Sequence, residues 1–279
     1  MLKFLKYRII KFLEKIPFIQ LFAYNNLSYF KFLFPHDKDY YALKLLFKKS
    51  EKRAFIDVGG NIGLSTIGFR ELGYKNNNIY VFEPDKKLYK NYLLNLKKYY
   101  KKIFLFNFGL SQKNEEKILY KAYYNNLFLH FNNSFSLNYI KKKIRSNYPK
   151  KYQRFSYQKE KLVLKNFDNL NLKNNICFVK IDVEGLDHIV LRGMKKTIKK
   201  QKPIILIEYN NSNFSSVYKI LKSIYFCYFY MLETNSLKKL NNLDLKKLIF
   251  NKSFDLKYSK NSFNLIFIPK DFIFINNLN

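Results

Sequence analysis

Short apolar runs alternate with segments of helical periodicity along most of the chain. Runs of this length with an apolar residue at nearly every position are typical of strands buried on both faces of a parallel sheet. Between the first two runs, Leu64, Ile67 and Leu72 recur at helical spacing, and Gly73 ends the pattern. Asp85 is the expected N-cap of a second helix over residues 85–99. The expected strands are 54–58, 79–82, 103–108, 178–181, 204–207 and, closing the sheet, 263–269, with additional strands at 115–120 and 161–165.

This alternation predicts an α/β fold, with a doubly wound and mostly parallel sheet covered by helices on both faces. Residues 1–53 differ, because they are mostly helical in pattern and basic. We find no Gly/Ser linker and no internal repeat. The chain is therefore interpreted as an N-terminal helical extension (1–53) followed by one domain (54–279).

The first 17 residues predict a basic amphipathic helix that ends near Pro17. We favour packing of this helix on the chain's own core; the alternative is peripheral contact with an anionic membrane. The longest charge-free run of this N-terminal segment, residues 16–30, is shorter than the roughly 20 apolar residues that span a bilayer. No small-residue cleavage site follows it, so we expect a cytoplasmic protein, with any membrane contact limited to the inner face.

One segment breaks the alternation. Residues 121–159 carry nine Lys or Arg and no Asp or Glu, and they show no clear period. A stretch of this length without periodicity is usually a functional or disordered loop. We treat 121–160 as a basic insertion in the domain.

Composition limits the classes of partner. The formal net charge is +32, but Lys supplies most of it and Arg is scarce. Dedicated nucleic-acid binders favour Arg for bidentate contacts. Much of the charge is therefore attributed to compositional bias, and no nucleic-acid partner is expected. Cys177 and Cys227 lie in apolar runs without metal-ligand spacing, which indicates structural thiols in a reducing compartment.

The strongest chemical signal is the segment FIDVGGNIG, in which Asp57 ends a strand and a glycine-rich turn opens a helix. Such a turn lets the backbone approach a nucleotide-like ligand. The dinucleotide pattern G-x-G-x-x-G and the phosphate-binding G-K-[ST] are both absent. A carboxylate pointing into the turn would repel pyrophosphate but suits the cationic S-adenosylmethionine. The candidate cofactor residues here are Asp57, Gly59, Gly60, Asn61 and Gly63.

A second acidic strand end follows in the segment YVFEPD. Glu83 would accept hydrogen bonds from ribose hydroxyls, as the acid at this place does in dinucleotide folds. Pro84 and Gly109 complete the candidate cofactor set.

A third segment, VKIDVEG, places Asp182 and Glu184 at the end of a buried strand. Residues two apart on a strand share a face, so both would reach one crevice. They could act as a base, orient an acceptor hydroxyl or hold a divalent ion, although no metal is assigned. The alternative is that Glu184 or Asp187 only caps the next helix. Asp182 is the first candidate for the base, and His130 in the insertion and Glu208 follow it.

These segments, in this order, resemble the FkbM-type methyltransferases. FIDVGGNIG is similar to their first motif, YVFEPD to their second, and FVKIDVEGLDHIVLRGM with PIILIEY to their long diagnostic stretch. The resemblance covers roughly residues 54–209 and the strand 263–269. It implies a Rossmann-like class I methyltransferase that uses S-adenosylmethionine to methylate a hydroxyl group, often on a sugar.

The sequence therefore predicts a carbohydrate O-methyltransferase, with a glycan or sugar nucleotide of surface polysaccharide synthesis as its acceptor. An RNA methyltransferase and a non-catalytic protein at a membrane surface remain as alternatives. The sequence gives no indication of the oligomeric state.

Overall fold

A computed structural model of the chain describes residues 35, 37–124, 127–183, 185–251 and 264–274. The expected N-terminal helix and Glu184 lie outside this part of the chain. Among the described helices, none combines the length and the apolar character that a membrane crossing requires.

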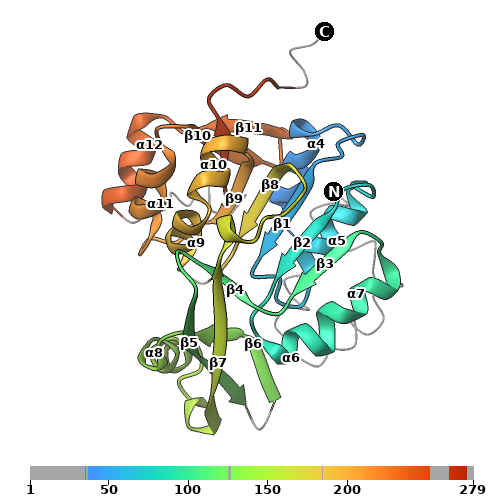
Figure 1. Ribbon diagram of the computed structural model, residues 1–279. Helices are drawn as coiled ribbons and strands as arrows, with labels where there is room; N and C mark the ends of the chain where they lie inside the picture. Colours follow the sequence, from blue (N-terminus) through green and yellow to red (C-terminus); the bar gives the residue numbers. More distant parts are fainter. Residues whose placement is uncertain (1–34, 36, 125–126, 184, 252–263, 275–279) are drawn as a thin grey trace.

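The centre of the molecule is an eight-stranded sheet (Figure 1). Five neighbouring strands, in the order β9-β8-β1-β2-β3, are parallel, as expected from their apolar runs. β12 lies antiparallel between β9 and β10, and β11 forms the outer edge next to β10. The bounds are β1 (Ala54–Val58), β2 (Ile79–Phe82), β3 (Ile103–Phe106), β8 (Ile176–Ile181), β9 (Ile204–Glu208), β10 (Tyr225–Met231), β11 (Ser236–Lys239) and β12 (Asn264–Pro269).

The last apolar run forms a strand but does not close the sheet, so that part of the prediction is wrong. All six residues of β12 are buried, which is the burial expected of an interior strand. β10 and β11, which the sequence did not indicate as strands, lie outside it. An apolar run shows that a strand is buried, but its place in the strand order depends on pairing between distant segments.

Helices cover both faces of this sheet (Figure 1). Side chains alternate along β1, so that Phe55 packs with Ile67 and Phe69 of one helical layer. Ile56 points the other way and packs against the layer that contains Leu191. The first layer contains α4 (Leu43–Leu46), α5 (Leu64–Glu71), α6 (Lys86–Leu88), a π-helical turn (Tyr89–Leu93) and α7 (Leu94–Tyr99), and the second contains α9 (Asp187–Gly193), α10 (Lys195–Gln201), α11 (Phe214–Leu221) and α12 (Asn242–Lys246).

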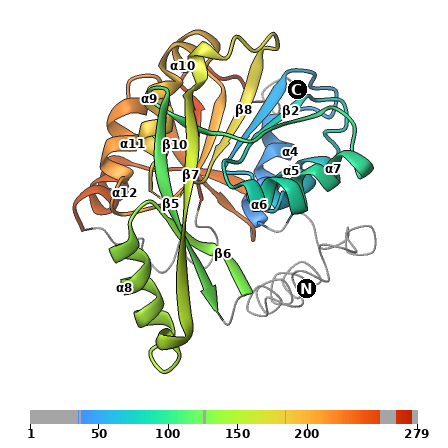
Figure 2. The same cartoon turned by 60° about the horizontal axis from the view of Figure 1, so that its bottom comes forward.

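The basic insertion is not the loop that the sequence led us to expect. A second sheet of four strands, in the order β4-β7-β5-β6, forms beside the carboxyl ends of the main strands, and α8 packs on it (Figure 2). The strands expected at 115–120 and 161–165 are confirmed as parts of β5 and β7, whereas β4, β6 and the extension of β5 and β7 into the insertion were missed. The reason is that the sheet is small and half-solvated, and that Lys121 interrupts the alternation on the side that faces inward. Its elements are β4 (Gly109–Ser111), β5 (Glu115–Tyr124), β6 (Leu127–Ser134), α8 (Leu137–Asn147) and β7 (Phe155–Asn166).

Candidate functional site

The turn between β1 and α5 is a backbone cradle that needs its glycines. Gly59 (φ 80°) and Gly63 (φ 88°) have left-handed conformations, and so does Asn61 (φ 48°). A Cβ at Gly59 would lie 2.0 Å from the carbonyl oxygen of Asp182, and one at Gly60 would lie 2.3 Å from Cγ1 of Val81. The predicted glycine turn is thus pressed against the ends of both neighbouring strands, β8 and β2.

Glu83 closes this cradle from the end of β2. Its Oε2 accepts a hydrogen bond from the backbone N–H of Asn61 at 2.8 Å, and its Oε1 accepts one from the N–H of Asp85 at 2.8 Å. The side chain is buried, and burial raises the pKa of Glu83 to about 7, with the nearby charge of Asp85 also raising it. Each carboxylate oxygen still has a second lone pair, so accepting further hydrogen bonds from a ligand is compatible with these contacts.

Asp57 does not point into the turn as we had expected. Its carboxylate is fully buried, and Oδ2 accepts a hydrogen bond from Oγ1 of Thr66 in α5 at 2.8 Å. Oδ1 lies 3.7 Å from Nζ of Lys180, its register partner on β8. The side chain therefore joins β1 to α5 and to β8 underneath the cradle.

Lys180 links Asp57 to the first candidate base. Its Nζ lies 3.1 Å from Oδ2 of Asp182, whose side chain is 41% exposed, and 3.4 Å from the carbonyl oxygen of Gly59. Burial would lower the pKa of Lys180, but the carboxylates of Asp182 and Asp57 hold it above its ordinary value. One ammonium thus compensates two carboxylates, and Asp182 keeps an open side toward solvent.

Sequence reasoning missed Lys180. The sequence shows a single lysine inside the apolar run ICFVKI. A lysine in a buried strand requires a partner of opposite charge, and this requirement was the available indication. That Lys180 is the register partner of Asp57 could not be predicted without knowing that β8 pairs with β1.

The remaining candidates divide into two groups. Pro84 and Gly109 are brought together with Glu83, because a Cβ at Gly109 would lie 3.2 Å from Cγ of Pro84, and the side chain of Asn107 donates hydrogen bonds to the carbonyls of Glu83 and Pro84. His130 lies on β6, the strand farthest from β4 in the second sheet, and its side chain is outside the described part. Glu208 ends β9 with an exposed side chain, and Glu184 is outside the described residues.

A family model described as the methyltransferase FkbM domain matches residues 57–229. The matched range contains the cradle, Glu83, Lys180 and Asp182. No curated protein matches the chain.

The chain is also similar to solved structures, two of which are named as methyltransferases. One is the FkbM methyltransferase of Methylobacillus flagellatus KT, with a TM-score of 0.48 and 16% identity; the alignment covers 70% of this chain and 45% of that one. A fibrillarin/Nop5p complex has a TM-score of 0.42 and 11% identity, with coverage of 84% and 81%. A precorrin-6y C5,15-methyltransferase of Geobacter metallireducens GS-15 has a TM-score of 0.36 and 11% identity, with coverage of 72% and 80%. The chain thus spans less than half the length of the Methylobacillus protein.

Proposed function

Since the chain belongs to the FkbM methyltransferase family, we propose that it transfers a methyl group from S-adenosylmethionine to a hydroxyl of a carbohydrate. The observation that carries the cofactor assignment is the cradle of Gly59–Gly63 held against Glu83. Family membership supports the reaction class, and the carbohydrate acceptor is our extension of it.

The residues of the cradle fit this cofactor. Its backbone takes left-handed angles and leaves no room for side chains, so a flat ligand can approach closely. Oδ1 of Asn61 is buried and accepts no hydrogen bond from the described residues, which leaves an acceptor for a ligand N–H group. Asp57 and Asp182 together outnumber Lys180 by one negative charge, a local excess that suits a cation in a chain of net charge +32.

S-adenosylmethionine would supply a methyl group already activated by its positive sulfur. The main task of the protein is then to hold the acceptor hydroxyl in line, and such alignment is worth about 7–11 kcal/mol. Asp182 would accept the hydroxyl proton, since its carboxylate is partly exposed beside the cradle; base assistance contributes about 10²–10⁴-fold. Lys180 would keep that carboxylate oriented through its 3.1 Å contact.

The second sheet supports an acceptor that carries negative charge. α8 buries Ile140 and Ile144 and exposes Lys141, Lys142 and Arg145. Exposed basic side chains on one helix can hold a phosphate or another anionic group of a sugar nucleotide. We therefore assign the insertion to acceptor binding.

Two measurements test this assignment. Labelled methyl transfer from S-adenosylmethionine should be offered sugar nucleotides, glycans and bulk RNA in parallel, and only the carbohydrates should be labelled. Replacing Lys141, Lys142, Lys143 and Arg145 with Ser should raise the KM of the acceptor more than that of the cofactor. A matched control replaces Lys195, Lys196, Lys199 and Lys200 of α10, which are also exposed, and should change neither KM. Methylation of RNA and not of sugars would overturn the proposed acceptor, and the absence of any transfer would favour a non-catalytic protein.

We also propose that the protein acts in the cytoplasm, where glycans are assembled on lipid carriers. Deleting residues 1–17 should lower the melting temperature by several degrees, because each buried large apolar side chain contributes about 1.5–3 kcal/mol. Unchanged stability, with loss of salt-sensitive binding to anionic vesicles, would instead show that this segment is a membrane anchor.

A further inference from the structure

A buried ion cluster joins the second sheet to the start of α6. Nζ of Lys121, on β5, lies 2.7 Å from Oδ2 of Asp85 and also contacts the carboxylate of Glu160 on β7. The side chains of Lys121 and Asp85 are only 5% and 1% exposed. Glu160 also accepts a hydrogen bond from the backbone N–H of Lys86. The insertion is therefore fastened to the polypeptide directly after Glu83.

The contacts continue from Asp85 into the cradle. Asp85 caps α6 by accepting hydrogen bonds from the N–H groups of Lys87 and Leu88, and its own N–H donates to Oε1 of Glu83. The other oxygen of Glu83 holds the N–H of Asn61. An unbroken series of polar contacts thus runs from Lys121 to the glycine turn.

We infer that Lys121 is a positioning residue of the cofactor site, which holds Asp85 in place and compensates its charge, so that the carboxylate of Glu83 is kept available as a hydrogen-bond acceptor. The second sheet then has two roles: it binds the acceptor, and through Lys121 it supports the cofactor site. This inference rests on the proposed role of Glu83 in binding S-adenosylmethionine.

The charges explain why a lysine is needed here. The charged groups that face Glu83 are Asp85, which raises the pKa of Glu83, and Lys180 on β8, which lowers it. Lys121 and Glu160 lie behind Asp85. Removing the ammonium of Lys121 leaves two adjacent carboxylates uncompensated, so Glu83 should be ionised only at higher pH.

The test measures the affinity for S-adenosylmethionine by calorimetry from about pH 6 to about pH 9. Lys121→Met should weaken binding near neutral pH by about two- to thirtyfold and recover toward the wild-type affinity at the alkaline end. Lys121→Arg, which keeps the cation, should retain the wild-type profile. Lys121→Met combined with Asp85→Asn should bring the pH midpoint to the wild-type value or below, because Asn still caps α6 without a charge. Lys161→Met, which breaks the exposed pair with Glu116 on the same sheet, should change nothing.

The outcomes separate the inference from the proposal on which it rests. A wild-type profile for Lys121→Met, or an equal loss at every pH, would overturn the positioning role. If Lys121→Met does not fold, the double variant decides, and a midpoint that stays above the wild-type value contradicts the inference. If Glu83→Gln binds the cofactor as the wild type does, the cofactor site itself is wrong and the inference fails with it.

Discussion

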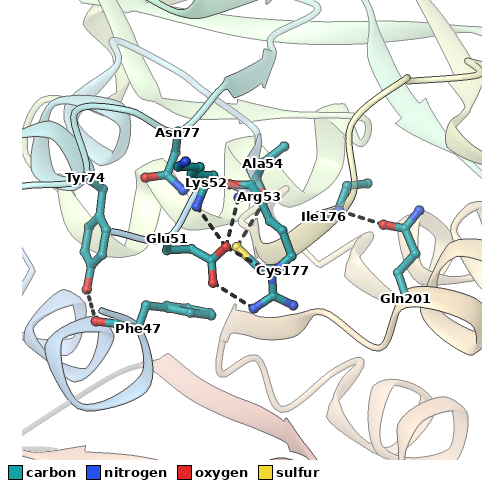
Figure 3. A network of polar contacts seen from close by, with 10 residues as sticks. All are labelled: Phe47, Glu51, Lys52, Arg53, Ala54, Tyr74, Asn77, Ile176, Cys177 and Gln201. Atoms are coloured by element: carbon teal, nitrogen blue, oxygen red, sulfur yellow. Dashed lines mark hydrogen bonds and ion pairs between the residues drawn. The ribbon is translucent and has the colours of Figure 1, made fainter. Parts of the chain in front are cut away.

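The two edges of the central sheet are built from different polar contacts. At the amino edge, Figure 3 shows hydrogen bonds to backbone groups and a partly exposed ion pair. The pair of Lys202 with Asp271 is also partly exposed, and the buried guanidinium of Arg70 donates only to backbone carbonyl oxygens in the described part of the chain. Glu51 pairs with Arg53 at 2.7 Å, where the arginine side chain is 49% exposed, and Gln201 accepts the N–H of Ile176 at 2.6 Å. At the carboxyl edge, Lys180 and Lys121 are almost fully buried, and each contacts two carboxylates.

This difference indicates which edge of the sheet is built to bind a ligand. Contacts of the first kind are sufficient to connect strands, and the ion pairs among them expose at least one partner to water. Buried ion pairs are seldom the most stable solution, because hydrophobic residues of similar volume are often at least as stable. The carboxyl edge keeps its charges, and we interpret them as the machinery that holds the cradle in shape for a ligand.

The largest expected effect is at the buried charge. Lys180→Met should lower the free energy of unfolding by about 3–5 kcal/mol, because Asp57 loses the cation beside it in the core. Arg53→Met at the amino edge should cost about 1 kcal/mol or less, as for other exposed pairs. Urea denaturation of both variants measures the contrast. Equal losses of unfolding free energy in the two variants would show that the ion pairs of the two edges contribute equally to stability.

Two left-handed glycines offer the next comparison. Gly59→Ala should destabilise by about 2–5 kcal/mol, since the left-handed angle is strained for Ala and the new Cβ meets the carbonyl of Asp182. Gly73→Ala at the amino edge has a similar angle, but the nearest atom is the flexible side chain of Lys49 at 3.5 Å, so about 1–2 kcal/mol is expected. Denaturation curves of both variants measure the loss of stability, and titrations with S-adenosylmethionine measure the loss of binding. Loss of binding in both variants would contradict a cradle confined to the carboxyl edge.

The pH dependence of stability should be specific to Glu83. Its pKa is about 7 in the folded protein and 4.5 in its ordinary state, so the folded state binds more protons between these values and loses stability as pH rises from about 4.5 to about 7. Compared with Glu83→Gln, the wild type should lose up to about 3 kcal/mol over this interval. Burial also raises the pKa of Asp187, to about 6, but this contribution is common to both proteins and cancels. Parallel curves of unfolding free energy against pH would contradict the burial of a titrating Glu83.

The sequence was informative where a local pattern determines the structure. Strands β1, β2, β8 and β9 follow from continuous apolar runs, and Asp85 caps α6 as predicted. The glycine turn and Glu83 were also brought together as expected. Alternate residues of the strand AFIDV share a face, so Asp57 lies on the same face as Phe55 and away from the turn. We nevertheless expected its carboxylate in the turn, because a negative charge there suits a cationic cofactor.

The missed features depend on contacts between distant segments. A lysine in an apolar run gives no sign of its partners, so Lys180 and Lys121 became interpretable only after β8 met β1 and the second sheet met α6. β4, β6, β10 and β11 were missed because their pairing is not local, whereas the strands expected at 115–120 and 161–165 are parts of β5 and β7. The family resemblance provided the reaction class, whereas the arrangement of charges came from the structure.

Titration calorimetry of S-adenosylmethionine into the wild type, Glu83→Ala and Arg53→Met tests the central claim most directly. The wild type and Arg53→Met should bind with equal affinity, because Arg53 lies at the amino edge. Glu83→Ala should bind roughly ten- to a hundredfold more weakly, since losing hydrogen bonds to a charged group costs about 1.5–3 kcal/mol. Absence of binding by the wild type, or the same affinity in all three proteins, would contradict a cofactor site at the carboxyl edge.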